Sequence, residues 1–395
     1  MPADPPRLIA VQLPPGASQA AAITAVWDAG DAVLPLDPQL SEQSRDAVLA
    51  ALRPEHLLDD RGLRDLPAPA RTEAGVAAVI LTSGSTGAPK AVELTSAALD
   101  ASAAASLARI DAVPDDRWLC CLPLHHIAGL QVLVRARRAR SAAVVHPGFD
   151  VAAVAAEPAV TMVSLVPTML QRLLDAGADV SRFRRVLLGG AAPAPDLLAR
   201  ARRAGARIVV TYGMTETGGG CVYDGRPLDG VEVAVDADGR IRLRGPVLFR
   251  GYRGEPAATN QALRDGWLGT ADLGRLTADG GLQVLGRADD VIITGGENVR
   301  AGEIAAALAE HPAIDEAAVV GRPDPEWGQR VVAFVVAPGV APALDEVRTF
   351  VRARLSGAHA PRELVVVDRL PRLASGKVDR LALHRLPSSP PPRPA

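Results

Sequence analysis

Lysine is nearly absent from this chain of 395 residues, because 43 residues are basic and only Lys90 and Lys377 among them are lysine. The excess of arginine itself indicates a genomic preference. An ammonium group is a compact, mobile point charge, whereas a guanidinium group is a planar fork, so the two side chains are not interchangeable. The two lysines are therefore candidates for positions at which the chemistry needs an ammonium group.

Cysteine is scarce, and the chain has neither a strong net charge nor a long apolar run. Cys120, Cys121 and Cys221 have no metal-ligand spacing, and the adjacent pair is a poor disulfide candidate, so we expect reduced thiols in the core. A net charge of -2 with dispersed signs gives no indication of nucleic-acid or anionic-membrane binding. No apolar run could cross a bilayer and residues 1–16 lack a signal pattern, which favours a cytoplasmic protein. Self-association to a homo-oligomer is left open.

The length and the apolar fraction of 48% predict a globular enzyme with more than one domain. Helical patterns alternate with short apolar runs up to residue 211, which predicts parallel sheet covered by helices on both faces. Expected helices are 96–109, 127–138, 167–176 and 195–205, and expected strands are 117–124, 142–146, 160–166, 185–188 and 207–211. After residue 231, short strands with Asp-Gly turns indicate antiparallel sheet. The predicted fold class is α/β, with a large N-terminal domain of mixed and parallel sheets, helices and a small antiparallel region, followed by a small mobile α+β domain.

A loop rich in hydroxyl groups and glycine follows the apolar run 76–81. It reads Thr82-Ser83-Gly84-Ser85-Thr86-Gly87-Ala88-Pro89-Lys90. Glycine lets backbone amides approach an anion closely, and the hydroxyls and the lysine add donors and positive charge, so the loop suits phosphate. It is not a Walker loop, because two residues separate the last glycine from the lysine and Ala91 replaces the hydroxyl residue that would hold magnesium.

All fixed positions of this loop match the phosphate-loop signature of the adenylate-forming superfamily, which the chain therefore resembles. The superfamily contains acyl-CoA and aryl-CoA ligases and the adenylation domains of peptide synthetases. Agreement over nine consecutive positions argues against a surface turn without a ligand. The resemblance implies that Thr86 is catalytic and that the loop binds ATP through Thr82, Ser83, Gly84, Ser85, Thr86, Gly87 and Lys90.

Three further motifs extend the resemblance. Residues 188–193 end a strand in small residues that leave room for a flat ring, and residues 211–217 match the family's Y-G-x-T-E element, whose glutamate holds magnesium. Residues 266–272 resemble G-W-x-x-T-G-D, whose aspartate binds ribose. Ala271 replaces the family's glycine, and the effect of its extra methyl group on the local turn is left open. The resemblance implies ATP binding by Gly190, Ala191, Thr211, Tyr212, Gly213, Thr215, Asp272 and Arg287, with Glu216 as a catalytic residue and magnesium ligand.

The C-terminal part carries the family's boundary motif at residues 286–290, in which Asp289 is the implied hinge. We expect an adenylation domain at 1–288, shortened at its N-terminus because only 81 residues precede the phosphate loop, a mobile domain at 289–385, and a disordered tail at 386–395. Lys377 matches the family's catalytic lysine, which contacts ATP and the forming acyl phosphate. The glycine loop 293–299 implies coenzyme A binding by Gly295, Gly296 and Glu297.

Two adjacent histidines, His125 and His126, stand where a predicted strand gives way to a predicted helix. A single histidine in such a place is most often structural. In the superfamily this position lines the acid pocket, and both residues 122–130 and residues 218–230 resemble the o-succinylbenzoate-CoA ligases of menaquinone synthesis. The resemblance implies that His126, Gly189 and Gly213 bind the acid substrate, and we interpret His125 as structural.

The predicted reaction is ATP-dependent activation of o-succinylbenzoate to an acyl-adenylate with release of pyrophosphate, followed by transfer to coenzyme A. The implied partners are ATP, magnesium, coenzyme A and a small carboxylic acid. Two alternatives stay open: a CoA ligase for another aryl or acyl acid, and a non-catalytic binding protein on the same fold. A panel of acids distinguishes the first alternative, and a failure to bind ATP would favour the second.

Overall fold

A computed structural model describes residues 5–82, 90–158, 160–372 and 378–387. The chain divides into two compact units. The first unit comprises Met1–Asp236, Arg242–Thr270 and Leu276–Gln283, and the second comprises Ala237–Ile241, Ala271–Arg275 and Val284–Ala395. The functional boundary at Asp289 stays a prediction.

The first sheet of the first unit has the strand order β16-β6-β5-β2-β1-β3-β4. Its strands are β1 (Leu8–Val11), β2 (Ala32–Pro35), β3 (His56–Asp59), β4 (Gly62–Asp65), β5 (Val76–Thr82), β6 (Lys90–Thr95) and β16 (Gly251–Tyr252). All residues of β1 and β2 are buried, as their continuous apolar sequences indicate. Strands β1, β2, β3 and β5 pair in parallel, whereas β5 and β6 are antiparallel.

The second sheet has the order β13-β12-β11-β10-β9-β7-β8. Its strands are β7 (Trp118–Cys120), β8 (Ala143–Val145), β9 (Met162–Leu165), β10 (Arg185–Leu188), β11 (Ile208–Met214), β12 (Gly219–Tyr223) and β13 (Arg226–Pro227). The five strands from β7 to β11 pair in parallel, as predicted. Strand β7 is shorter than the expected 117–124, because the chain leaves the sheet before Pro123, which has no N–H to donate.

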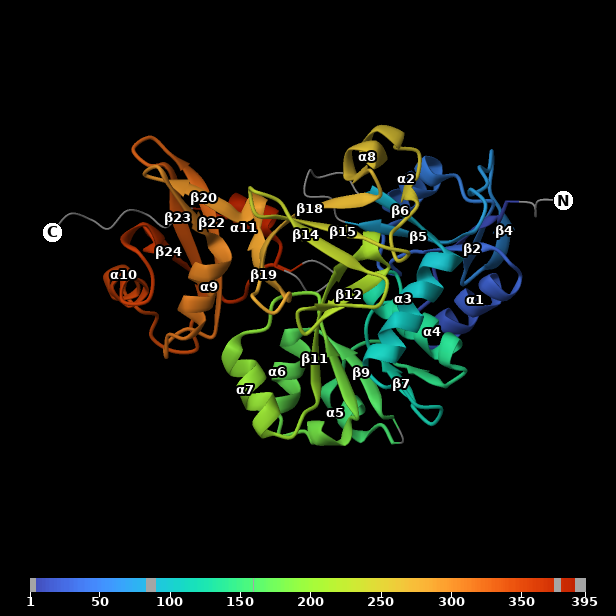
Figure 1. The fold of residues 1–395 in the computed structure, drawn as a ribbon, viewed down its shortest axis with the longest axis horizontal. Helices are drawn as coiled ribbons and strands as arrows, with labels where there is room; N and C mark the ends of the chain where they lie inside the picture. The colour runs from blue at the N-terminus through green and yellow to red at the C-terminus, as the bar shows by residue number, and fades with distance from the viewer. Residues whose placement is uncertain (1–4, 83–89, 159, 373–377, 388–395) are drawn as a thin grey trace. The chain divides into compact units, whose positions relative to one another are not determined.

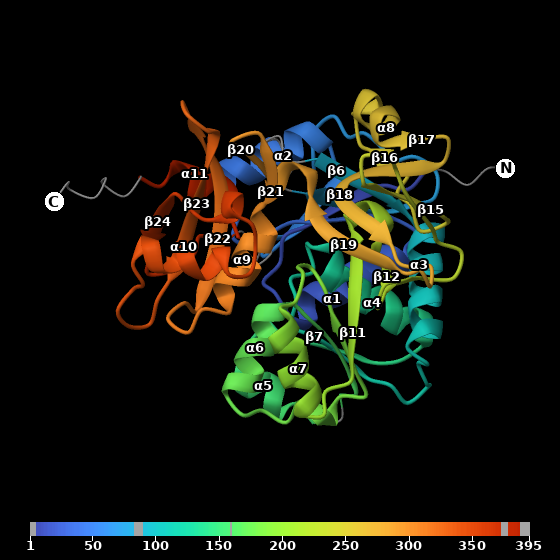
Figure 2. The same ribbon diagram turned by 60° about the vertical axis from the view of Figure 1, so that its left-hand side comes forward.

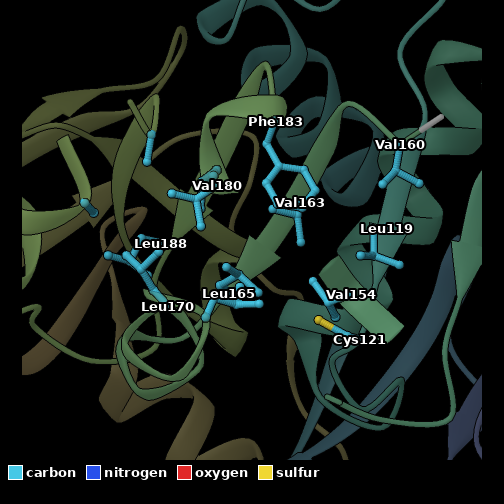
Figure 3. Packing of buried hydrophobic residues seen from close by; sticks show 14 residues of the cluster. Leu119, Cys121, Val154, Val160, Val163, Leu165, Leu170, Val180, Phe183 and Leu188 are labelled. Carbon is cyan, nitrogen blue, oxygen red and sulfur yellow. The ribbon is translucent and has the colours of Figure 1, made fainter. Parts of the chain in front are cut away.

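Helices cover both faces of the second sheet (Figure 1 and Figure 2). The helices of the first unit are α1 (Ala17–Asp28), α2 (Glu42–Leu52), α3 (Ser96–Arg109), α4 (Ile127–Ala139), α5 (Val151–Ala156), α6 (Pro167–Asp175), α7 (Pro195–Arg203) and α8 (Pro256–Ala262). α1 and α3 contact strands of both sheets, α4 packs on α3 and on the second sheet, and α5, α6 and α7 cover the other face of the second sheet. Figure 3 shows Leu119, Val163 and Leu188 of this sheet packed with Leu170 of α6 and Val154 of α5.

A third sheet has the order β14-β15-β18-β17, with β19 beside β18. Its strands are β14 (Glu232–Val235), β15 (Arg240–Arg244), β17 (Leu263–Arg264), β18 (Trp267–Leu276) and β19 (Leu282–Arg287). Glycines at Gly239 and Gly280 have φ of 83° and 78°, the left-handed backbone that the two Asp-Gly turns require. The change to short strands after residue 231 is thus confirmed.

The second unit contains a sheet of order β21-β20-β23-β22, with β24 beside β23. Its elements are β20 (Val291–Thr294), β21 (Glu297–Arg300), α9 (Ala301–Ala309), β22 (Glu316–Asp324), β23 (Gly328–Val336), α10 (Leu344–Arg352), β24 (Glu363–Val366) and α11 (Arg380–Arg385). Ile304 and Leu308 of α9 pack with Val347 and Val351 of α10 in a core of its own. This small α+β unit agrees with the predicted fold class.

Candidate active site

The ends of the phosphate loop are fixed by a strand pair. Thr82 ends β5, Lys90 begins β6, and the antiparallel register sets the two residues opposite each other. The Thr82 hydroxyl donates to the Lys90 carbonyl at 3.3 Å. The predicted residues between them, from Ser83 to Gly87 and including Thr86, lie outside the described residues, so their roles stay predictions.

Tyr252 connects this strand to the predicted magnesium ligand. Lys90 Nζ lies 4.7 Å from the centroid of the Tyr252 ring, and the Tyr252 hydroxyl donates to Glu216 Oε1 at 2.9 Å. Burial and the neighbouring Glu216 carboxylate raise the pKa of Tyr252, so its hydroxyl stays a donor at neutral pH. Tyr252 was not predicted from the sequence, because its contact depends on the pairing of β16 with β6, two strands from distant parts of the chain.

Glu216 follows directly on the end of β11. A bulge between Tyr212 and Gly213 interrupts the pairing of β11 with β12, and the chain then forms the short 3-10 helix Thr215–Thr217. The buried Thr217 hydroxyl accepts a hydrogen bond from the Met214 amide at 2.9 Å and donates one to the Gly219 carbonyl at 2.6 Å. This compact turn places Thr215 and Glu216 at the strand end, where the sequence predicted them.

The glycine-rich end of β10 lies beside β11. A Cβ atom on Gly189 would lie 2.3 Å from Thr211 Oγ1, and that hydroxyl donates to the Leu188 carbonyl at 3.3 Å. Gly190 has φ of 81°, which favours glycine. The predicted residues of the two motifs, including Ala191 and Tyr212, therefore come from the carboxyl ends of neighbouring parallel strands. Parallel sheets bind ligands at this edge.

His126 occupies the N-cap position of α4, so the helix begins at Ile127 as expected. Its ring centroid lies 4.4 Å from that of His125. His125 Nε2 lies 4.0 Å from Asp37 Oδ2, but burial lowers the pKa of His125 more than this carboxylate raises it. A Cβ atom on Gly129 would lie 2.2 Å from the Pro123 carbonyl oxygen, so the first turn of α4 packs tightly on the preceding loop.

The two predicted ribose-binding residues come together within the second unit. Arg287, the last residue of β19, donates through Nη1 to Asp272 Oδ1 at 3.4 Å. The effect of Ala271 was left open by the sequence; in the structure residue 271 lies inside the ten-residue strand β18 and has no positive φ. Asp289 lies in the short 3-10 helix Ala288–Asp290, and Asp290 forms an ion pair with Arg380.

Gly295 and Gly296 form the two-residue loop of the β20–β21 hairpin. Both have positive φ, 59° and 82°, as such tight hairpins require. They border an open hollow of 580 Å³ that is lined by Val291, Ile293, Gly295, Gly296, Glu326, Trp327, Gly328 and Gln329. Glu297 is not among the lining residues and is exposed. Trp327, which the sequence analysis missed, carries the Arg362 guanidinium at 3.3 Å from its ring centroid. Lys377 lies outside the described residues.

Glu216, the predicted metal ligand, fits a magnesium ion that is also bound by the phosphates of a nucleotide. Within the described ranges, no group of three or more histidine, cysteine, aspartate or glutamate side chains could hold a metal by itself. Mg²⁺ is commonly bound by one or two carboxylates together with substrate phosphates, which one glutamate at the predicted phosphate edge would satisfy.

The three cysteines are buried and free, as expected. No helix in the described part of the chain is long and apolar enough to span a membrane.

Comparison with known proteins identifies the family. The AMP-binding enzyme model matches residues 59–253, and the model of the AMP-binding enzyme C-terminal domain matches residues 303–377. A probable 2-succinylbenzoate–CoA ligase of Mycobacterium tuberculosis is 44% identical over 356 residues, which cover 86% of this chain and 88% of that protein. The chain belongs to the AMP-binding enzyme family. The resemblance to adenylate-forming enzymes is thus confirmed.

Solved structures of this family also match the fold. The o-succinylbenzoate CoA synthetase MenE from Bacillus subtilis, in complex with the acyl-adenylate intermediate OSB-AMP, has a TM-score of 0.88 and 30% identity, covering 98% of this chain and 90% of that chain. The same synthetase in complex with ATP and a magnesium ion has a TM-score of 0.84 and 30% identity, covering 95% and 89%. These similarities confirm the predicted fold class of this family member.

Proposed function

We propose that this member of the AMP-binding enzyme family is an o-succinylbenzoate–CoA ligase that forms AMP and pyrophosphate. One observation carries the proposal: the Lys90 ammonium and the Glu216 carboxylate both contact Tyr252, which lies at the edge of the first sheet. These are the two kinds of group that a magnesium–triphosphate substrate needs. The choice of acid rests on the similarity to 2-succinylbenzoate–CoA ligases over most of the chain.

In the first step, a carboxylate oxygen of the acid attacks the α-phosphorus of ATP, and the bond to pyrophosphate breaks. A carboxylate is a poor electrophile, and this step gives it AMP as a leaving group. The magnesium ion, when bound, neutralises phosphate charge. We assign Glu216 to hold that ion, Lys90 to neutralise the departing pyrophosphate, and Asp272 with Arg287 to bind the ribose hydroxyls.

The remaining contacts of the first step follow from the glycine-rich strand ends. The carboxyl ends of β10 and β11 are assigned to the adenine ring and the α-phosphate through Gly190, Ala191, Thr211, Tyr212, Gly213 and Thr215. The acid is assigned to Gly189 and Gly213, with His126 as the polar partner of its second carboxylate. A buried second carboxylate needs such a partner inside an otherwise apolar pocket.

In the second step, the thiol of coenzyme A loses its proton, its sulfur attacks the acyl carbon, and the bond to AMP breaks. We assign Lys377 to the first step and the loop of Gly295 and Gly296 to the second, with rotation about Asp289 between them. The hollow beside these glycines and Trp327 supports a role in coenzyme A binding. The proposal includes a cytoplasmic location, where ATP and coenzyme A are available.

The test is pyrophosphate release with a panel of acids: o-succinylbenzoate, its ester blocked at the succinyl carboxylate, benzoate and a long-chain fatty acid. We expect activity with o-succinylbenzoate and at least about tenfold weaker activity with the ester, because a buried polar partner is then left unpaired. His126→Ala should raise the KM for o-succinylbenzoate about tenfold without changing the KM for ATP.

His146→Ala is the matched control, because His146 is also largely buried and pairs with Glu157 at 2.8 Å. It should leave both KM values unchanged. Efficient activation of benzoate or the fatty acid with o-succinylbenzoate inert would establish the alternative of another acid–CoA ligase. A chain that does not bind ATP would instead be the non-catalytic binding protein.

A further inference from the structure

Tyr252 contacts two charged groups of the proposed site: Glu216, which is assigned to magnesium, and Lys90, which is assigned to the phosphates. Its hydroxyl donates to Glu216 Oε1 at 2.9 Å, and its ring faces Lys90 Nζ at 4.7 Å. We propose that Tyr252 is a positioning residue that holds the Glu216 carboxylate and the Lys90 ammonium in place while keeping the two charges apart. The inference deepens the proposed function and depends on the roles assigned there to Glu216 and Lys90.

The Tyr252 ring is held by contacts that involve neither charged group. Its backbone pairs with Val92 of β6, and its amide donates to the Thr259 hydroxyl at 2.8 Å. The ring of Phe249 packs edge-on at a centroid distance of 4.9 Å. The Phe249 amide also donates to the Glu216 carbonyl at 2.8 Å, which fixes the backbone of the glutamate to the same segment. These contacts therefore fix the position of Tyr252 independently of the Lys90 ammonium and the Glu216 carboxylate.

The two contacts act differently on the two charges. The hydroxyl orients the carboxylate through one oxygen, Oε1. The ring attracts the ammonium through its electron-rich face without neutralising it. Lys90 and Glu216, both in the described part of the chain, form no ion pair with each other. A direct ion pair would cancel the charges that the phosphates and the metal need, whereas each group here contacts a different part of Tyr252.

The test is calorimetric titration of ATP at a series of free Mg²⁺ concentrations. Tyr252→Phe removes the hydroxyl and keeps the ring, so Mg²⁺-dependent ATP affinity should fall about tenfold while ATP affinity without Mg²⁺ is retained. Tyr252→Leu also removes the ring, so affinity without Mg²⁺ should fall as well, because Lys90 loses its support. Tyr223→Phe is the matched control, because it removes a buried tyrosine hydroxyl that contacts Ser106 at 2.7 Å. This variant should leave ATP affinity unchanged both with and without Mg²⁺.

A double-mutant cycle separates this inference from the proposed function. Glu216→Gln should weaken Mg²⁺-dependent binding, and adding Tyr252→Phe to it should have no further effect. Wild-type Mg²⁺ dependence in folded Tyr252→Phe, with Glu216→Gln impaired, would overturn the positioning role alone. Wild-type Mg²⁺ dependence in Glu216→Gln would overturn the metal assignment and the positioning role with it. A thermal melt of each variant checks that it is folded. If Tyr252→Leu does not fold, the comparison of Tyr252→Phe with wild type still tests the positioning role.

Discussion

Gly189 and Thr211 stand so close that a Cβ atom on residue 189 would lie 2.3 Å from Thr211 Oγ1. Gly189→Ala must therefore displace the threonine or separate β10 from β11. We expect a loss of about 1–3 kcal/mol in the free energy of unfolding, and weaker ATP binding because Thr211 belongs to the proposed adenine site. Urea unfolding and calorimetric ATP titration measure the two effects. Gly148→Ala, where a Cβ atom meets nothing within 4 Å, should change neither. Unchanged ATP affinity in Gly189→Ala would contradict the adenine-site assignment.

The contact between Asp272 and Arg287 predicts a specific loss at the ribose. Asp272→Ala should weaken ATP binding about tenfold, because a hydrogen bond to a charged group is lost. Wild-type protein should bind 2',3'-dideoxy-ATP about tenfold more weakly than ATP, whereas Asp272→Ala should bind the two nucleotides equally. Asp279→Ala is the control, because Asp279 pairs with Arg226 at 2.5 Å outside the proposed site. Equal discrimination by wild type and Asp272→Ala would exclude the ribose contact.

The sequence predicted those parts of the site that lie within single motifs. Glu216 and Thr211 belong to one strand and its turn, and parallel pairing of β10 with β11 follows from alternating strands and helices. These relationships depend on short-range sequence patterns, which is why they could be predicted. Asp272 and Arg287 were both assigned to ribose by the resemblance, and their contact across the adjacent strands β18 and β19 is seen only in the structure.

The remainder depends on pairings that no local pattern specifies. Tyr252 reaches Glu216 and Lys90 only because β16 adds to the edge of the first sheet beside β6. Trp327 reaches Gly295 because β23 begins beside the end of β20. The effect of Ala271 could not be judged from the sequence, because it depends on whether β18 continues as one long strand through that residue, as it does.

The buried thiols predict a loss of stability at alkaline pH. Burial raises the pKa of Cys120 to about 11 and the pKa values of Cys121 and Cys221 to about 12, from 9.0. Above pH 9 the unfolded chain releases these protons and the folded chain keeps them, so the free energy of unfolding falls as pH rises towards 11. Each thiol should contribute about 1 kcal/mol between pH 9 and 10, where the unfolded thiol is only partly ionised, and its slope should rise towards about 1.4 kcal/mol per pH unit at higher pH. Urea unfolding at pH 8, 9 and 10 measures the slope.

The chain has only two lysines, and Tyr252, whose pKa is also raised, adds to the fall mainly above pH 10, so the slope is read between pH 9 and 10. Cys121→Ala should reduce the slope between pH 9 and 10 by about one thiol's share. The thiols should also resist alkylation in the folded protein at pH 8 and react fully in urea. A pH-independent free energy of unfolding, or rapid alkylation of the folded protein, would contradict the raised pKa values.

The two half-reactions should be separable by mutation. Lys377→Ala should slow pyrophosphate release by about 10² to 10³ while still converting supplied acyl-adenylate to thioester. Gly296→Leu should form adenylate and stall, because the side chain would enter the hollow beside Trp327. Residue 296 has a backbone φ of 82°, so any side chain there also strains the turn. Gly280→Leu is the control for this strain, because Gly280 has φ of 78° and equally open surroundings. Equal impairment of both steps by both variants would contradict alternation between two states.

The most direct test of the two-step, AMP-forming reaction is rapid-quench product analysis with the enzyme in excess over ATP. With o-succinylbenzoate and Mg²⁺ but no coenzyme A, we expect one acyl-adenylate and one pyrophosphate per ATP consumed. Subsequent addition of coenzyme A should convert the adenylate to o-succinylbenzoyl-CoA and AMP in equal amounts. Formation of ADP and phosphate, or of thioester without a preceding adenylate, would contradict the proposed function.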